Sequence, residues 1–294
     1  SVAAVRRELE IWLGSLPSDQ PIGMLFSGGL DSGCVLLALY RLLLERGESP
    51  ARLKAFTLSI DGGGADADQA REFLRRVELE MLGETVTAEA DELDPFAAVE
   101  VIEDYKPLDV ECAAVNLALM ERIRRAYPDW RFVVDGDGGD ENLKDYPIEE
   151  NAELTIRSVV NNHLLYQEGW GVECLKHSLV YSGGYSRACV RTAAPLRRFG
   201  FAGFSPHAQP SVVAVAAAIP FDELSQGSHQ QLYDLKGEIF RRGIKTVSGM
   251  ELPVFPKRRF QHGATTPEVF QSRFGVDPDL YRSHFNGLYR APTA

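Results

Sequence analysis

A polar hexapeptide between two apolar segments constrains the fold of this chain more than any other stretch of its sequence. The run IGMLF at residues 22–26 is followed by SGGLDS at 27–32 and then by the apolar segment CVLLALYRLLLERG at 34–47. A short apolar run that ends at glycine is typical of a buried parallel strand. The longer run is apolar on nearly all sides and closes with glycine, which predicts a largely buried helix. We therefore expect a strand, a small-residue loop and a helix in direct succession.

Strand-like and helix-like segments alternate through the first half of the chain. This alternation predicts βαβ units, and so an α/β fold with a parallel Rossmann-like sheet covered by helices on both faces. Further strands are expected at 53–60, 84–88 and 131–136, and helices at 1–16, 66–82, 94–105, 112–127 and 211–220. From about residue 149 the apolar segments look helical. We expect a single domain over 1–294, with an α/β part at about 1–148 and a helical part at about 149–294.

The loop at 27–32 has the composition of a phosphate-binding loop. Ligands of parallel sheets bind at the carboxyl ends of the strands, where this loop is expected. Gly28 and Gly29 allow close approach of the backbone to a ligand, and the first N–H groups of the next helix suit an anion. The Walker pattern and the dinucleotide pattern G-x-G-x-x-G are both unmatched. An acid in such a loop, Asp31, indicates Mg²⁺ between the carboxylate and the phosphates.

A second acidic loop follows another predicted strand. The stretch FVVDGDGGDEN carries Asp135, Asp137 and Asp140. Because both loops follow parallel strands, we expect them to open on the same edge of the sheet, where Asp31 and an acid of the second loop share a metal ion. Taken alone, the second loop is equally typical of a solvated acidic turn, although it lacks the spacing of a twelve-residue calcium loop.

The two loops together carry a resemblance to a known family. SGGLDS resembles the signature of the PP-loop, or N-type, ATP pyrophosphatases, which split ATP to AMP and pyrophosphate. SGGLDSG combined with DGDGGDE is similar to the synthetase domain of glutamine-dependent asparagine synthetase, in a branch that includes β-lactam synthetase. The segments at 56–70, 190–220 and 252–263 agree in order and spacing. The resemblance spans roughly residues 5 to 265 and implies an adenine nucleotide alpha hydrolase-like fold.

The resemblance implies a nucleotide and metal site at the first loop. Asp31 and Asp140 are expected to bind Mg²⁺, which bridges the phosphates of ATP. Charge that develops as the bond between the α- and β-phosphates breaks is neutralised by that ion. The β- and γ-phosphates are expected in a cradle formed by groups around Ser27, Gly28, Gly29 and Ser32.

The resemblance also implies roles beyond the phosphates. Lys257 matches the family's late lysine, which stabilises the adenylation transition state as a point charge. Asp137 stands where family members vary, and a role in orienting or deprotonating the amine is expected for it. Adenosine contacts, mostly through the backbone, are expected from Leu25, Leu58, Ser59, Asp135 and Gly136.

The activity that the resemblance implies is a two-step amide synthesis. A substrate carboxylate attacks the α-phosphorus of ATP to give an acyl-adenylate and pyrophosphate, and an amine then displaces AMP. A glutaminase domain with an N-terminal nucleophilic cysteine is not expected, because no cysteine precedes Cys34. Free ammonia, a separate ammonia-supplying chain or another amine remain as nitrogen sources. After DGGDE the chain reads NLKDY in place of the family's Leu-Phe-Gly-Gly-Tyr, so a specialised amide is at least as well supported as asparagine.

Composition separates the alternatives to this activity. A PP-loop enzyme of sulfur transfer or tRNA modification would favour paired thiols and a basic surface, whereas this chain has four cysteines without C-x-x-C and a net charge of −11. A non-catalytic nucleotide-binding subunit is the other alternative.

The cysteine usage, and the lack of an apolar run of about 18 residues or a signal pattern, favour a cytoplasmic protein without membrane insertion. Nucleic acid is not an expected partner, and homo-oligomerisation is left open.

Overall fold

The computed structural model describes residues 1–144, 189–255 and 260–289 of the chain. The strands are β1 (Ile22–Leu25), β2 (Leu53–Ile60), β3 (Gly83–Ala88), β4 (Phe132–Val134) and β5 (Ala202–Phe204). The helices are α1 (Val2–Ser15), α2 (Leu30–Glu45), α3 (Asp66–Arg76), α4 (Pro95–Ile102), α5 (Pro107–Ala126), α6 (Gly139–Leu143), α10 (Ala194–Arg198), α11 (Pro210–Ala217), α12 (Phe221–Ser225), α13 (His229–Ser248), α14 (Phe260–Gly263), α15 (Pro267–Phe274) and α16 (Pro278–Leu288). Short helical turns are η1 (Pro50–Arg52), η2 (Glu80–Leu82), η3 (Ala90–Glu92), η5 (Cys189–Ala193) and η6 (Pro206–Ala208).

The five strands form a parallel sheet in the order β3-β2-β1-β4-β5. This confirms the predicted Rossmann-like α/β class with helices in the second half of the chain. Met24 at the centre of the sheet pairs with Ala55 of β2 on one side and with Val134 of β4 on the other. The chain runs outward from β1 to β3 and then returns to β4 on the opposite side. The loops after β1 and β4 therefore flank the switch point, where ligands bind in such sheets.

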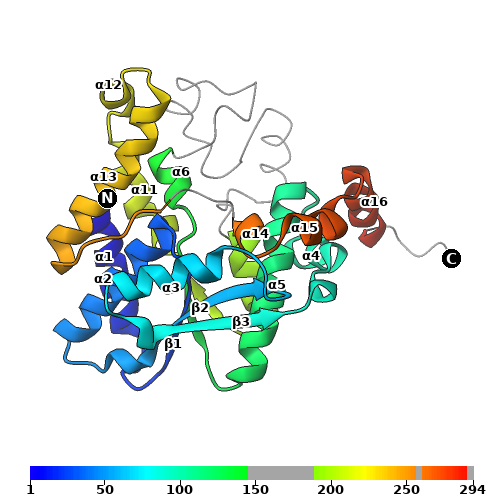
Figure 1. Ribbon diagram of the computed structural model, residues 1–294, viewed down its shortest axis with the longest axis horizontal. Coiled ribbons are helices and arrows are strands. Elements are labelled where there is room, and N and C mark those ends of the chain that lie inside the picture. The colour runs from blue at the N-terminus through cyan, green and yellow to red at the C-terminus, as the bar shows by residue number, and fades with distance from the viewer. Residues whose placement is uncertain (145–188, 256–259, 290–294) are drawn as a thin grey trace.

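Two apolar cores cover the two faces of the sheet. The first contains side chains of α1, α2, α3 and α13, and the second contains side chains of α4, α5, α15 and α16. Successive residues of β2 alternate between them: Ala55 belongs to the first core, whereas Phe56 belongs to the second. In Figure 1 the N-terminus lies beside α13, and α16 lies at the far side of the molecule. The central strands β1 and β4 are apolar because both faces of the sheet are covered there, whereas the edge strands β3 and β5 carry exposed residues.

Helix α2 begins earlier than the sequence predicted. It starts at Leu30 with Gly29 as an extended N-cap, so Asp31 and Ser32 lie in its first turn and not in a loop. Residues Cys34 to Leu39 of this helix are fully buried, which matches its apolar character on nearly all sides. A carboxylate in the first turn is favourable because it faces the positive end of the helix dipole. The connection after β1 is therefore shorter and more rigid than the hexapeptide implied.

Strand β5 was not predicted from the sequence, because the apolar segments in the second half of the chain were expected to form helices. It is a three-residue strand at the edge of the sheet, and its Gly203 pairs with Val133 of β4. Its sequence, AGF, has neither the alternation of apolar and polar residues nor the β-branched residues that are typical of a strand. The Phe204 ring stacks on Trp12 of α1 at 5.0 Å between ring centroids. Pairing and packing from distant segments therefore hold this strand in place.

Two predicted helices end sooner than expected because their chains enter the left-handed region. The segment at 66–82 contains α3, which ends at Arg76, and Glu78 then has a φ of 58°. Helix α4 ends at Ile102, where Glu103 has a φ of 51°. Non-glycine residues adopt such angles only locally and do not continue a right-handed helix.

Candidate active site

The two loops that the sequence singled out lie against each other at the switch point. A Cβ on Gly136 of the second loop would come within 2.7 Å of the backbone nitrogen of Ser32. A Cβ on Gly139 would overlap the carboxylate of Asp31. Both glycines are therefore needed for the contact, because any side chain would separate the two loops.

The loop after β1 is held in shape by its own polar groups and by α3. Gly28 has a φ of +72°, and a Cβ there would lie 2.8 Å from the backbone nitrogen of Ala70. The hydroxyl of Ser27 accepts a hydrogen bond from the Gly29 N–H at 3.3 Å and lies 3.3 Å from the Ser32 hydroxyl. The side chain of Gln69 donates to the Ser27 carbonyl at 3.3 Å. The loop is thus preformed, as expected of a phosphate cradle.

Asp31 and Asp140, the predicted metal ligands, contact the same ammonium group. Nζ of Lys236 on α13 lies 2.8 Å from Oδ2 of Asp31 and also pairs with Oδ1 of Asp140. The Lys236 side chain is 2% exposed, whereas those of Asp31 and Asp140 are 23% and 36% exposed. The two carboxylates therefore meet at one point of positive charge, with the lysine on the buried side and the acids nearer the surface.

This donor set fits a hard divalent cation in part. Two carboxylates that share one cation are the oxygen ligands that Mg²⁺ prefers. Among the described residues, no three His, Cys, Asp or Glu side chains converge on a common point. Mg²⁺ sites that use one or two carboxylates are completed by waters and substrate phosphates, so the set fits an ion that arrives together with a nucleotide.

Asp135 shapes the second loop from within the protein. Its side chain accepts hydrogen bonds from the Asp137 N–H at 3.0 Å and from the Ser205 hydroxyl at 2.8 Å. Burial, with the nearby charge of Asp137, raises the pKa of Asp135 well above its ordinary value. Both of its oxygens are used in these contacts, which is typical of a residue that fixes a turn.

Asp137 lies half-buried at the centre of a hydrogen-bonded chain. Its Oδ2 accepts a hydrogen bond from the hydroxyl of Thr192, and Asn116 on α5 donates to that hydroxyl oxygen at 3.2 Å. Burial raises the pKa of Asp137, while the Thr192 hydrogen bond and the charge of Arg191 act in the opposite direction. A carboxylate with a raised pKa is suited to accept a proton near neutral pH.

A cluster of buried charged side chains lies next to the residues that hold Asp137. Nζ of Lys106 lies 2.5 Å from Oδ2 of Asp104 and 3.1 Å from Oδ2 of Asp109. Nε of Arg191 donates to Oδ1 of Asp109 at 2.6 Å, and the Arg191 carbonyl accepts from the Asn116 amide at 3.0 Å. Two acids and two bases therefore form one buried charged cluster next to Thr192, the residue that donates to Asp137.

His207 is a buried side chain that contacts the backbone of Asp31. It is 1% exposed, and its Nε2 lies 3.5 Å from the backbone oxygen of Asp31. Its ring packs against Phe240 of α13 at 5.5 Å, and the Asn142 amide donates to its carbonyl at 2.8 Å. Burial lowers the pKa of His207 to about 4, so its ring is neutral at physiological pH. His207 therefore acts as a packing and hydrogen-bonding support, and not as a charged ligand.

The remaining predicted residues are Leu25, Leu58, Ser59 and Lys257. Leu25 ends β1 and is half-buried, and Leu58 lies in the second apolar core at 2% exposure. The hydroxyl of Ser59 donates to the Gly63 carbonyl at 2.9 Å. Lys257 lies outside the described residues.

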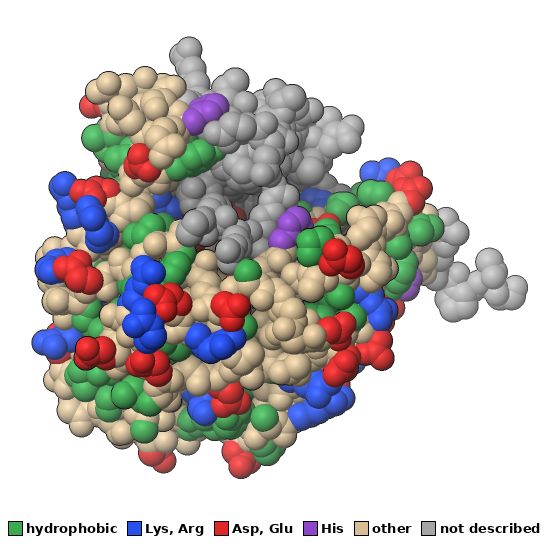
Figure 2. All heavy atoms as spheres, in the orientation of Figure 1, with side chains coloured by type: hydrophobic (Ala, Val, Ile, Leu, Met, Phe, Trp, Pro, Cys, Tyr) green, Lys and Arg blue, Asp and Glu red, His purple; other side chains and the backbone are tan. Residues whose placement is uncertain are grey.

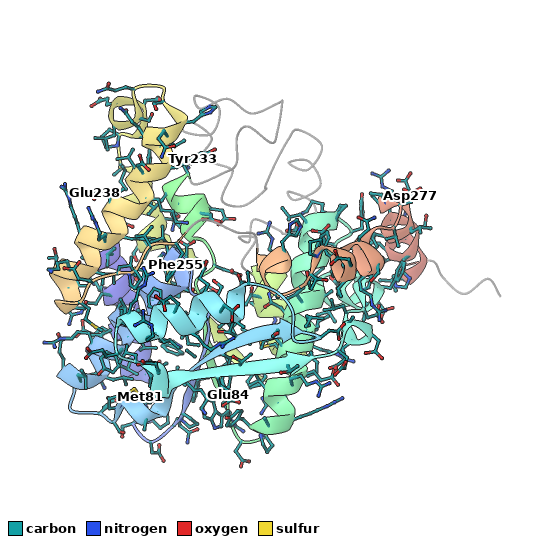
Figure 3. The ribbon with its side chains drawn as sticks, in the orientation of Figure 1. Met81, Glu84, Tyr233, Glu238, Phe255 and Asp277 are labelled. Carbon is teal, nitrogen blue, oxygen red and sulfur yellow. The ribbon has the colours of Figure 1, made fainter. Side chains whose placement is uncertain are left out.

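Lys236 is the main site residue that was not predicted from the sequence. On α13 the buried positions recur as Leu232, Lys236, Phe240 and Ile244, four residues apart. A charged residue in the apolar stripe of an amphipathic helix is rarely fully buried without a partner. That break in the stripe was the available signal. Figure 3 labels Tyr233 and Glu238 on the same helix.

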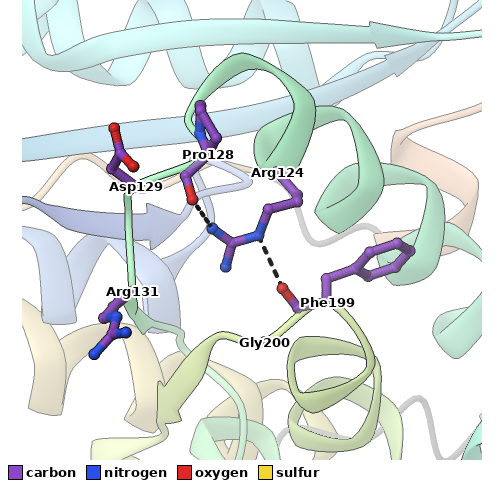
Figure 4. A pocket seen from close by; sticks show the side chains of 6 residues that line it. All are labelled: Arg124, Pro128, Asp129, Arg131, Phe199 and Gly200. Atoms are coloured by element: carbon purple, nitrogen blue, oxygen red, sulfur yellow. Dashed lines mark hydrogen bonds between the residues drawn. The ribbon is translucent and has the colours of Figure 1, made fainter.

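A hollow elsewhere on the surface does not belong to this site. It is lined by Arg124, Arg131 and Phe199 among others and lies near the start of β4, at the opposite edge of the sheet (Figure 4). Arg124 donates to the carbonyls of Phe199 at 2.9 Å and Pro128 at 2.6 Å. These bonds, with the guanidinium 3.9 Å above the Phe201 ring, make Arg124 a clamp between α5 and the α10–β5 connection.

The exposed charges give no sign of a nucleic-acid surface on the face drawn in Figure 2. Lys and Arg side chains of the described residues alternate there with Asp and Glu. Binding of phosphate backbones relies on concentrated basic side chains. Of the helices in the described ranges, none combines the length and apolar character needed to cross a bilayer.

The fold and the site together define a class of protein. A parallel Rossmann-like sheet, with a Ser-Gly-Gly loop and an acidic loop on either side of its switch point, is the arrangement of the PP-loop nucleotide-binding proteins. Residues 12–181 match the family model described as asparagine synthase, so the chain belongs to that family of ATP-dependent amide-forming synthetases. No curated protein matches the chain.

Proposed function

We propose that this protein is an ATP-dependent synthetase that adenylates a substrate carboxylate, releases pyrophosphate and passes the acyl group to ammonia or another amine. The observation that carries the proposal is the convergence of Asp31 and Asp140. They come from two strand ends of the switch point and meet at one cation, beside a preformed small-residue loop. Family membership supports the same class of reaction.

The loop after β1 binds the leaving pyrophosphate in this proposal. Groups around Ser27, Gly28, Gly29 and Ser32 hold the β- and γ-phosphates, at the N-terminus of α2. Asp31 and Asp140 are the residues that would hold Mg²⁺. When bound, that ion neutralises negative charge on the phosphates.

The chemistry proceeds in two displacements. An oxygen of the substrate carboxylate attacks the α-phosphorus, and the bond to the bridging oxygen breaks with release of pyrophosphate. The amine nitrogen then attacks the acyl carbon, AMP leaves with the electron pair, and the nitrogen loses a proton. Asp137 is proposed to orient the amine or accept that proton, and Lys257 to stabilise the charge of the first transition state.

Adenosine is proposed to bind along the strand ends, mainly through the backbone. The hydroxyl of Ser59 and the carboxylate of Asp135 are engaged in internal hydrogen bonds. Leu58 is a core residue. Contacts from these positions and from Leu25 and Gly136 therefore depend on backbone groups more than on side-chain identity.

Sulfur transfer receives less support than amide synthesis. Of the four cysteines, the two whose side chains the structure describes, Cys34 and Cys112, are both buried. Burial raises the pKa of Cys112 to about 12, so this thiol is neither accessible nor ionised near neutral pH. A reactive cysteine of a sulfur carrier has the opposite properties.

The first experiment measures AMP and pyrophosphate formation from Mg-ATP with a panel of carboxylic acids, each with and without ammonia. Acid-dependent exchange of labelled pyrophosphate into ATP detects the adenylate even without the correct amine. We expect one class of acid to trigger pyrophosphate release, and Asp31→Ala to abolish it. Asp68→Ala removes an exposed acid of α3, 77% exposed, and is the matched control. If ATP binds but no acid triggers release or exchange, a non-catalytic nucleotide-binding role replaces this proposal.

A further inference from the structure

The ammonium of Lys236 lies where the two proposed metal ligands meet. Its Nζ is 2.8 Å from Asp31 Oδ2 and also pairs with Asp140 Oδ1. In the described structure, the positive charge of Lys236 therefore neutralises part of the negative charge of the two carboxylates.

The position of this ammonium is set by rigid surroundings. Lys236 belongs to the buried stripe of α13 that includes Leu232 and Phe240, and these two side chains lie in the first apolar core with α2. Its side chain is 2% exposed and is among the largest fully buried side chains described. A charge so deeply buried requires anionic partners, because desolvation without them is costly.

The backbones that carry the two acids are held in place by contacts other than those with the lysine. Asp31 lies in the first turn of α2, its backbone oxygen lies 3.5 Å from Nε2 of His207, and Gly139 leaves room for its carboxylate only by lacking a side chain. Asp140 lies in the first turn of α6. A divalent ion that binds both carboxylates must therefore come close to the ammonium.

We propose that Lys236 is an internal counter-cation that competes with the divalent metal ion for Asp31 and Asp140, so that the ion binds tightly only together with ATP. This inference rests on the metal site of the proposed function. Taken together, these two carboxylates and the ammonium carry a net charge of −1, and a divalent ion added alone would bring the sum of these groups to +1. The phosphates of ATP supply the additional anions that make the ion and the ammonium compatible. Metal and nucleotide binding are therefore coupled through Lys236.

Binding of Mn²⁺, followed by electron paramagnetic resonance of the free ion, tests this coupling without catalysis. We expect wild type to bind Mn²⁺ weakly alone and at least roughly 100-fold more tightly with α,β-methylene-ATP, a coupling of ~3 kcal/mol. Lys236→Met should bind Mn²⁺ alone at least roughly tenfold more tightly than wild type and show a smaller effect of the nucleotide. Lys245→Met removes a charge from an exposed position of the same helix, 58% exposed, and should behave like wild type.

Two outcomes overturn the inference. Wild-type protein that binds Mn²⁺ equally well with and without the nucleotide analogue has no such coupling, and this measurement does not depend on the folding of any variant. A folded Lys236→Met variant whose affinity for Mn²⁺ alone is unchanged would show that the lysine does not compete with the ion, and a weaker affinity would show that the lysine supports the ion. Lys236→Arg, which keeps the charge, should retain the weak affinity for Mn²⁺ alone.

The test separates this inference from the proposed function. Tighter Mn²⁺ binding by Lys236→Met supports the inference even if no acid triggers pyrophosphate release. Conversely, acid-dependent pyrophosphate release with unchanged Mn²⁺ binding in the variant supports the synthetase and rejects the counter-cation.

Discussion

Nε of Arg191 lies 2.6 Å from Oδ1 of Asp109, and this ion pair joins the second half of the chain to α5 in the first half. Asp109 is 1% exposed, and Lys106 pairs with its other carboxylate oxygen at 3.1 Å. Thr192, next to Arg191, holds Asp137. The charged cluster of Lys106, Asp109 and Arg191 therefore helps to position Asp137, the proposed catalytic acid, through Thr192.

Replacing Asp109 by asparagine should destabilise the protein strongly. The substitution keeps the shape of the side chain but leaves two buried cations with one carboxylate fewer, which costs about 3 kcal/mol for a buried pair. Urea denaturation measures the change in the free energy of unfolding. Glu238→Gln, on the exposed side of α13 where Glu238 pairs with Arg241, should change it by less than about 1 kcal/mol. Equal effects of the two substitutions would contradict a structural role for the buried cluster.

Thr192→Val should alter the pH dependence of amide formation. Valine has nearly the same shape but removes the hydroxyl that donates to Asp137, and this hydrogen bond lowers the pKa of that carboxyl. Its loss raises the pKa of Asp137, so the acidic limb of the pH–rate profile should move to higher pH, with a roughly tenfold lower rate below neutral pH. Thr246→Val, at an exposed hydroxyl of α13, is the control. A profile that stays in place would argue against Asp137 as the base.

Gly139→Ala should impair the site without unfolding the protein. A Cβ at this position overlaps the Asp31 carboxylate, which must rotate away from Asp140 and Lys236. Displacement by about 1 Å at a reacting centre costs on the order of 100-fold in rate, and acid-dependent pyrophosphate release measures it. Gly237→Ala is the matched control, because no atom lies within 4 Å of the added Cβ and alanine favours the helix by about 0.5 to 1 kcal/mol. Full activity of Gly139→Ala would show that the contact between the loops is not needed.

His207 should make stability depend on pH on the acidic side. In the unfolded chain its pKa is 6.5, whereas burial lowers the pKa in the fold to about 4. Between these values the unfolded state binds more protons, so the free energy of unfolding falls as the pH drops from 6.5 to about 4, by about 3 kcal/mol in total. His207→Gln should flatten this part of the stability curve measured by urea denaturation. His284→Gln, at a partly exposed histidine beside Glu100, is the matched control substitution.

Much of the architecture could be predicted from local patterns. The apolar run before Ser27 and the glycines that follow it identify a strand and a ligand loop, because burial periodicity and backbone freedom are properties of neighbouring residues. Asp31 and an acid of the second loop could be paired in advance because parallel strands direct their carboxyl ends to one edge of the sheet, whereas the choice of Asp140 came from the resemblance to the PP-loop family. Prediction was weaker for β5, whose three residues carry no strand pattern, and for the start of α2, which depends on the conformation of a single glycine.

The sequence by itself determined the parallel α/β fold, the two loops and their joint position at the switch point. Only the tertiary structure decided that Lys236 would lie between Asp31 and Asp140, that Thr192 would hold Asp137, and that an edge strand would form near residue 203. Lys236 and Asp31 are 205 positions apart in the chain. The energy of such contacts depends on which helix faces pack together, and no local pattern records that choice because the partners lie far apart in the sequence.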